Sequence, residues 1–199
     1  MAETNTSGII TAAADIIAGA FNALPKRVCN QHKFSDYADY LHENLPAQAE
    51  LDLQREKPLN PAPLVSVAIA CAGASRAAVR STLEALGKQT YANFEVCVVS
   101  ELAQAGLTDY EGIPKFRLVL FNGTAHEQLK AAEKMLNGAY FLQLLPGDLP
   151  APDALHMLVL QTHANPEAEV VFADEDSVID GIRQNPIFKP DYGRDTLRS

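Results

Sequence analysis

From Leu64 onward, short apolar runs rich in β-branched residues alternate with segments of helical periodicity, and this alternation constrains the fold more than any other feature of the sequence. The runs are apolar on both faces, as expected of strands that are covered on both sides in a parallel sheet. The predicted strands are 65–71, 94–99, 116–121, 139–145 and 168–173, and the predicted helices are 75–88, 124–136 and 152–163. The pattern predicts an α/β fold, a mostly parallel open sheet with helices on both faces.

The first 56 residues follow a helical pattern instead. An apolar stripe runs from Ile9 to Leu24, and a second helix is predicted over 34–45. The stripe fits packing against the chain's own domain or docking on a protein partner, and it lacks the basic face that membrane binding favours. The prolines within 57–63 favour an extended connector. We therefore expect a helical N-terminal extension (1–56), a proline-rich linker (57–63) and an α/β domain (64–199).

Composition and charge exclude several classes of protein. With 25 acidic and 16 basic residues, the net charge is -9, which argues against a surface that binds nucleic-acid backbones. Residues 1–8 lack the basic segment of a secretory signal, and the apolar stretch 8–24 is short of the roughly 20 residues that a membrane span needs. The cysteines lack metal-ligand spacing and fit reduced thiols: Cys29, Cys71 and Cys97. A soluble cytoplasmic protein is expected.

In open parallel sheets, ligands bind beyond the carboxyl ends of the strands. The loops predicted at that edge begin at Cys71, Ser100, Phe121, Pro146 and Asp174. The first of these loops has neither the G-x-G-x-x-G pattern nor a P-loop lysine. A dinucleotide-binding or P-loop enzyme is therefore disfavoured.

Three consecutive acids, Asp174, Glu175 and Asp176, follow the last predicted strand. Carboxylates this close are expected to raise the pKa of at least one of them or to bind a cation, and a solvated acidic loop is the alternative. Lys189 and Arg194 come soon afterwards. We expect these two basic side chains to pair with the acids or to contact a phosphate.

Three segments resemble, in the same order, motifs of family 2 glycosyltransferases of the GT-A fold. PLVSVAIACAGASRAAVRSTLEALGKQTYANFEVCVVS is similar to the opening of these enzymes, including its Gln89-Thr90-Tyr91 turn. GAYFLQLLPGDLPAPDAL resembles the region that carries their metal loop. NPIFKPDYGRDTLRS is similar to a run found in bacterial members that build surface polysaccharides. The resemblance covers roughly two thirds of the chain, from Pro63 to Ser199.

The resemblance implies a GT-A, Rossmann-like fold that transfers a sugar from a nucleotide-diphosphate donor to a glycan or protein acceptor. Such transfer uses a divalent cation, Mg²⁺ or Mn²⁺, to neutralise the diphosphate leaving group, and a carboxylate base to take the hydroxyl proton. The implied donor-binding residues are Glu101, Asp148 and Asp174, and the implied metal ligands are Asp148 and Asp176. For Asp148, a purely structural role in the turn before the next helix is the alternative.

The sequence departs from the family where the metal loop is expected. The pattern L-D-x-D-D becomes Leu144-Leu145-Pro146-Gly147-Asp148, which keeps only the final aspartate. The resemblance ends at Ser199, before the region that supplies the catalytic base, so no base is assigned. Two hypotheses follow. The first is the donor-binding half of a glycosyltransferase in surface polysaccharide or glycoprotein synthesis. The second is a non-catalytic GT-A-like module with an eroded donor site, which docks through the Ile9–Leu24 helix.

Overall fold

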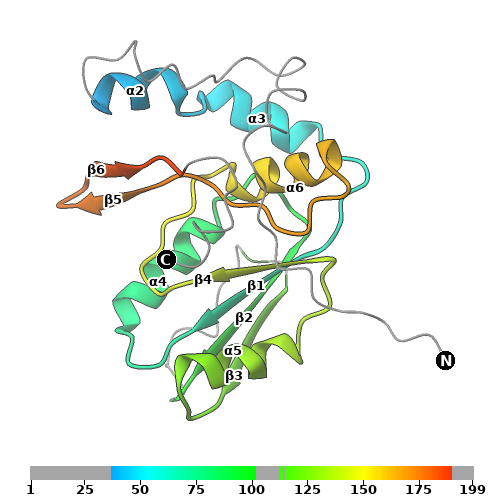
Figure 1. Cartoon of the computed structure of the whole chain (residues 1–199), viewed down its shortest axis with the longest axis vertical. Helices are drawn as coiled ribbons and strands as arrows, with labels where there is room; N and C mark the ends of the chain where they lie inside the picture. Colours follow the sequence, from blue (N-terminus) through cyan, green and yellow to red (C-terminus); the bar gives the residue numbers. More distant parts are fainter. Residues whose placement is uncertain (1–36, 102–112, 114, 190–199) are drawn as a thin grey trace.

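The structure of the chain, a computed structural model, describes residues 37–101, 113 and 115–189. Its centre is a four-stranded sheet in the order β3-β2-β1-β4, in which every neighbouring pair is parallel (Figure 1). The strands are β1 (Val65–Ala70), β2 (Phe94–Ser100), β3 (Phe116–Leu120) and β4 (Tyr140–Leu144). The predicted α/β fold with a parallel open sheet is confirmed, and these four strands lie within one or two residues of their predicted bounds.

Helices cover both faces of the sheet. On one face α4 (Arg76–Leu86) and α6 (Ala154–Ala164) pack on the sheet, and on the other lies α5 (Ala125–Glu133). Successive side chains of a strand point to opposite faces. Val67 of β1 therefore joins the core beneath α4 and α6, whereas Ala68 joins the core beneath α5. This two-sided burial is the reason that most strand residues are apolar.

The predicted helix starts are set by side-chain caps. Ser75 Oγ accepts a hydrogen bond from the backbone N–H of Ala78 and begins α4. At the start of α5, Thr124 and Glu127 form a capping box, in which Glu127 Oε2 accepts from the Thr124 backbone N–H at 2.9 Å. Both caps satisfy backbone donors that a helix leaves unpaired at its first turn.

The N-terminal part of the described chain forms two helices, α2 (Tyr37–Asn44) and α3 (Gln48–Glu56). The first confirms the helix predicted over 34–45. Residues 57–63 form no helix or strand, as their prolines predict. Side chains tie α3 to the α/β part: Gln54 accepts from Thr90 Oγ1 at 2.6 Å, and Arg55 donates to the Lys88 carbonyl at 3.3 Å. The stripe from Ile9 to Leu24, and with it Cys29, lies outside the described residues.

The fifth strand predicted over 168–173 is wrong, because this segment forms neither helix nor strand. It still buries part of its apolar content, since Val171 is buried and lines a crevice of about 40 Å³ with Tyr140 and Leu142 of β4. Apolar side chains can thus be covered by a neighbouring strand and helix without a ladder of backbone hydrogen bonds. The apolar sequence pattern indicates burial, but it does not distinguish a strand from a buried segment without regular structure.

An antiparallel hairpin takes the place of a fifth parallel strand. Its strands are β5 (Glu175–Ile179) and β6 (Ile182–Ile187), which form a separate two-stranded sheet. The turn between them is Asp180-Gly181, with φ of 53° and 78°. Positive φ at both central residues is the requirement of a type I′ hairpin turn, and Asp-Gly is a favoured pair there. Figure 1 shows α2 lying across this hairpin.

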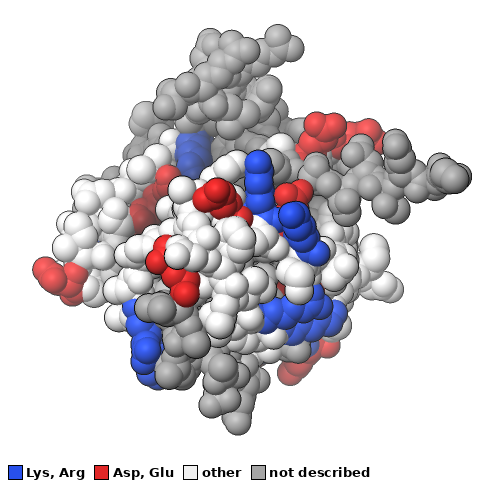
Figure 2. Space-filling model, turned by 90° about the horizontal axis from the view of Figure 1, so that it is seen from below, with Lys and Arg blue, Asp and Glu red and all other residues white. Residues whose placement is uncertain are grey.

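No helix in the described ranges is both long enough and apolar enough to cross a bilayer. On the face shown in Figure 2, the basic side chains that are coloured lie in separate groups, with acidic and uncharged residues between them. The visible part of this face therefore lacks the continuous basic surface that a phosphate backbone would require.

Candidate functional site

The sheet has a topological switch point between β1 and β4. The chain proceeds from β1 outward through β2 to β3, and β4 then returns to the opposite side of β1. In open sheets of this kind, ligands bind in the crevice outside the carboxyl ends of the two strands at which the order reverses. The loops after β1 and β4 are therefore the first place to look for a site.

The β4–α6 loop (145–153) is held to α4 at its beginning. The backbone N–H of Gly147 donates to Thr82 Oγ1 at 2.9 Å and to the Ala78 carbonyl at 3.1 Å. Gly147 has a φ of 104°, a conformation that side-chain-bearing residues rarely adopt. The glycine therefore allows the loop to turn back onto α4.

The Gln89-Thr90-Tyr91 turn holds the other end of the same loop. The Gln89 side chain donates to the Ala151 carbonyl at 2.6 Å and accepts from the Leu155 N–H at 2.9 Å. The Thr90 backbone N–H donates to the Pro152 carbonyl at 2.8 Å. The sequence analysis did not predict this connection, which places the two motifs in direct contact. Because both ends are bonded to fixed elements, the loop is preorganised.

Asp148 lies in this loop and is exposed. Its Oδ2 accepts a hydrogen bond from the Leu145 N–H at 2.7 Å, and its own N–H donates to the Leu145 carbonyl at 3.0 Å. The side chain thus closes its own turn, which is the structural role weighed for it from the sequence. Oδ1 takes no part in this bond, so the carboxylate keeps one oxygen for a ligand beyond β4.

The other residues at this edge are less informative. Glu101 directly follows β2 and is exposed, and the segment after it lies outside the described residues. Cys71 directly follows β1 and is buried, and burial raises the pKa of its thiol to about 11. A thiol with such a pKa is protonated at neutral pH and is not a nucleophile. Cys71 and Cys97 are both buried and free, as expected of reduced thiols.

The three consecutive acids do not follow a parallel strand, and instead lead into the hairpin. Asp176 is their most buried member, with a side chain 9% exposed. Its Oδ2 accepts from the Tyr37 hydroxyl at 2.5 Å and from Arg183 Nε at 2.6 Å. Asp176 therefore joins α2 to β6, a role that the sequence analysis missed.

The pKa of Asp176 shifts in the direction opposite to the one expected for clustered acids. Burial favours a higher pKa, but the hydrogen bonds from Arg183 and Tyr37 and the charge of Arg183 outweigh it, so the pKa lies below its usual value. Burial, followed by the bond to Asp176, raises the pKa of Tyr37 to about 12. Asp176 is therefore ionised at neutral pH, and Tyr37 keeps its proton.

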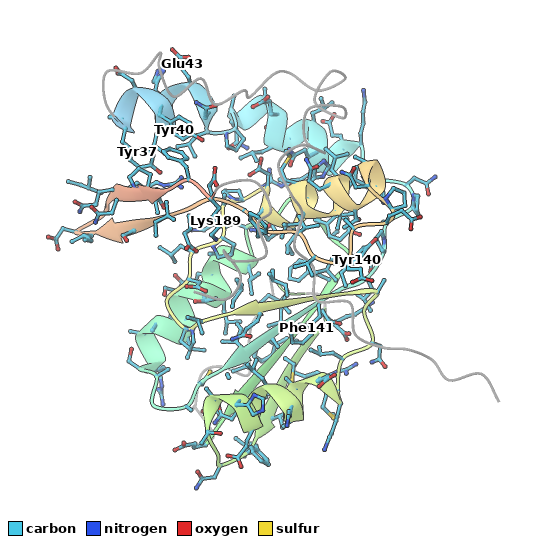
Figure 3. All side chains as sticks on the ribbon, in the orientation of Figure 1. Tyr37, Tyr40, Glu43, Tyr140, Phe141 and Lys189 are labelled. Atoms are coloured by element: carbon cyan, nitrogen blue, oxygen red, sulfur yellow. The ribbon has the colours of Figure 1, made fainter. Side chains whose placement is uncertain are left out.

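Lys189 pairs with the remaining acids, as expected from the sequence. Its Nζ lies 3.3 Å from Glu175 Oε2 and donates to the Ala173 carbonyl at 2.8 Å. Its backbone N–H donates to Asp174 Oδ1 at 2.8 Å. These contacts close the base of the hairpin, and Figure 3 shows Lys189 beneath it. Arg194, the other predicted partner, lies outside the described residues.

Within the described ranges, no group of three or more His, Cys, Asp or Glu side chains is arranged to hold a metal ion. Asp176 is a poor candidate ligand, because its Oδ2 already accepts from Tyr37 and Arg183. Asp148 offers one carboxylate oxygen, Oδ1, that takes no part in a hydrogen bond among the residues that the structure describes. A cation at this edge would therefore depend on Asp148 together with oxygens supplied by a ligand, an arrangement known for Mg²⁺.

No family model matches the chain. The chain is 33% identical over 144 residues to an uncharacterized protein of Sinorhizobium fredii, a match that covers 68% of this chain and 16% of that protein. It is 26% identical over 174 residues to the O-antigen biosynthesis protein RfbC of Myxococcus xanthus, which covers 83% of this chain and 14% of that protein. The chain thus matches only a small part of these much longer relatives.

Proposed function

We propose that the chain binds a nucleotide-diphosphate sugar at the carboxyl edge of its sheet, as the donor-binding half of a family 2-like glycosyltransferase in polysaccharide synthesis. The observation that carries the proposal is the β4–α6 loop, which is bonded at both ends and presents Asp148 beside the switch point. The order of the sequence motifs and the similarity to an O-antigen biosynthesis protein support it.

Each proposed role follows from position. Asp148 would contact the donor diphosphate through a shared Mg²⁺ or Mn²⁺, using the oxygen that its turn leaves uncommitted. Such a cation, when bound, neutralises the charge that develops on the leaving diphosphate. Glu101, exposed beyond β2, would contact the nucleoside. Asp174 would lie toward the donor from the hairpin base, and Asp176 would hold that hairpin against α2. The proposal assigns no catalytic base.

A second candidate is a non-catalytic interaction module that no longer binds a donor. The observation that favours it is the hydrogen bond from Leu145 to the Asp148 carboxylate, which gives the aspartate a structural role without any ligand. Such a module would dock on a protein partner through the Ile9–Leu24 stripe. The two candidates differ in one measurable property, the binding of a nucleotide sugar.

Thermal-shift measurements with UDP, GDP and dTDP sugars, each with and without Mn²⁺, distinguish these candidates. A ligand that binds only the folded chain raises its melting temperature, by an amount that grows with the ratio of ligand concentration to Kd. The donor-site proposal predicts stabilisation by at least one nucleotide sugar, and larger stabilisation when Mn²⁺ is present. The absence of stabilisation by all three classes contradicts it and favours the interaction module.

A further inference from the structure

A cleft of about 180 Å³ lies between α2, the hairpin and the end of the β4–α6 loop. A single water needs about 10–15 Å³ of such space, whereas sites for drug-sized ligands measure about 300–1,000 Å³. The cleft is thus suited to one ring-sized group. Ala151, Asp153 and Asp174 contribute to its wall but Asp148 does not, so the cleft adjoins the proposed donor site and shares only Asp174 with it.

Three aromatic side chains line the cleft among its apolar residues. The Tyr40 ring stacks against the Tyr37 ring, with centroids 5.7 Å apart and planes at 16°, and makes an edge-to-face contact with the Phe188 ring, with centroids 5.2 Å apart and planes at 77°. Figure 3 shows Tyr37 and Tyr40 reaching from α2 toward the hairpin. Offset-stacked and edge-to-face arrangements are the favourable ones for aromatic rings. Tyr40 is therefore held in place from two sides before any ligand arrives.

Polar groups surround this aromatic wall. Asn44, Asp174, Glu175 and Arg183 all contribute to the lining. Arg183 is oriented by the bond from its Nε to Asp176, and its guanidinium carries further N–H donors on the two Nη groups. The wall therefore combines carboxylate acceptors with guanidinium and amide donors.

The balance of charge in the cleft selects the class of ligand. Three lining residues are acidic, Asp153, Asp174 and Glu175, against the one arginine. A phosphate or another anion would meet net repulsion there. A neutral sugar ring does not meet this repulsion. Its apolar C–H face suits an aromatic ring, and its hydroxyl groups both donate to carboxylates and accept from arginine.

We propose that this cleft binds one neutral pyranose unit of the acceptor glycan. The C–H face of the sugar packs on Tyr40, and its hydroxyls bond to Glu175 and Arg183. The identification of this glycan as the acceptor rests on the proposed function, whereas the binding of a pyranose does not. The hairpin and α2 then form one wall of an acceptor path that begins beside the donor loop.

Saturation-transfer NMR with neutral methyl pyranosides tests the cleft directly. The probes are the methyl glycosides of glucose, galactose, mannose and rhamnose, with the full chain. We expect signal from ring protons of at least one probe, and a Tyr40→Ala variant that weakens binding by about tenfold through the loss of the aromatic contact. A Phe121→Ala variant is the matched control, because Phe121 is an exposed aromatic beyond β3, and it should bind as the unmodified chain does.

A second variant and a comparison with nucleotide-sugar binding complete the test of the cleft. If Tyr40→Ala does not fold, Glu175→Lys at the exposed rim should weaken the signal in its place. The absence of signal from every probe, or equal signals for the Tyr40→Ala and Phe121→Ala variants, overturns the cleft proposal. A signal that depends on Tyr40 in a chain that binds no nucleotide sugar upholds the cleft and contradicts the donor site. Nucleotide-sugar binding without any pyranoside signal upholds the donor site and contradicts the cleft.

Discussion

The Tyr37 hydroxyl donates a hydrogen bond to Oδ2 of Asp176, 139 positions further along the chain, at a distance of 2.5 Å. This bond joins α2 to the hairpin, and Arg183 completes it from β6 with a 2.6 Å bond to the same oxygen. The cleft between these elements depends on the three side chains, because they fix the distance between its two walls. Stability and binding are therefore coupled at this point of the structure.

Removal of either partner of Asp176 should lower the free energy of unfolding by different amounts. Tyr37→Phe deletes one hydrogen bond while the ion pair remains, which costs about 1 kcal/mol. Arg183→Met leaves the nearly buried carboxylate without its counter-charge and should cost about 2 kcal/mol. Urea unfolding measures both values. Tyr140→Phe is the matched control, because the Tyr140 hydroxyl makes no hydrogen bond within the described residues, and a loss as large as that of Tyr37→Phe would contradict the assignment.

Acid should weaken the chain through Asp176. The pKa of this carboxyl is lowered in the folded chain, so its stabilising contribution is complete above the unfolded value of 3.8 and is lost as the pH falls below that value toward the folded pKa. The urea midpoint should therefore decrease with falling pH in this range. The decrease should be smaller in Asp176→Asn, which has no proton to take up. Identical pH profiles for the two proteins would exclude Asp176 as a source of the effect.

Two glycines should respond in opposite ways to a methyl group. A Cβ at Gly138 would lie 2.5 Å from Ser66 Oγ and 2.7 Å from the Leu64 carbonyl oxygen, so Gly138→Ala forces backbone to move and should cost about 1–3 kcal/mol. At Gly87 the nearest atom is 3.6 Å away and φ is -62°. Gly87→Ala should be neutral or should stabilise by up to about 1 kcal/mol through the unfolded state. Urea midpoints decide the comparison, and equal effects would contradict the packing described at Gly138.

The hydroxyl of Thr82 should matter for donor binding without contacting the donor. It accepts from the Gly147 N–H at 2.9 Å and so holds the loop that carries Asp148. Thr82→Val keeps the shape of the side chain and removes that acceptor, which should cost about 1–2 kcal/mol of stability and weaken nucleotide-sugar binding. Ser81→Ala, on the same helix but bonded only to the Ala78 carbonyl, is the control that should bind normally. Unchanged nucleotide-sugar binding in Thr82→Val would contradict the claim that donor binding depends on the bond between Thr82 and the loop.

The strands of the parallel sheet were predictable because their burial on both faces leaves a local record. Val96 and Val98 face one core while Cys97 and Val99 face the other, so the whole run is apolar. The helix starts were predictable for a similar reason, since Ser75 and Thr124 act on residues three positions away. Local chemistry of this kind can be recognised from the sequence alone.

The errors concern features whose causes are distant in sequence or ambiguous in pattern. The segment 168–173 is apolar without being a strand, and the Asp180-Gly181 turn that does mark the hairpin was not recognised. The position of Asp148 in a loop beyond β4 was predicted, but not its bond to Leu145. The hydrogen bond of Tyr37 left no local signal in the sequence, because its partner Asp176 lies 139 positions further along the chain. Contacts between distant segments require the folded structure.

Calorimetric titration of a nucleotide sugar in the presence of Mn²⁺ tests the central claim most directly. The unmodified chain is compared with Asp148→Asn and with Asp52→Asn, a matched change on the exposed surface of α3. We predict binding that requires Mn²⁺, is preserved in Asp52→Asn, and is weakened about tenfold or more in Asp148→Asn through the loss of a carboxylate ligand. Equal affinity of the two variants, or the absence of binding by the unmodified chain, would contradict the donor site proposed at this edge of the sheet.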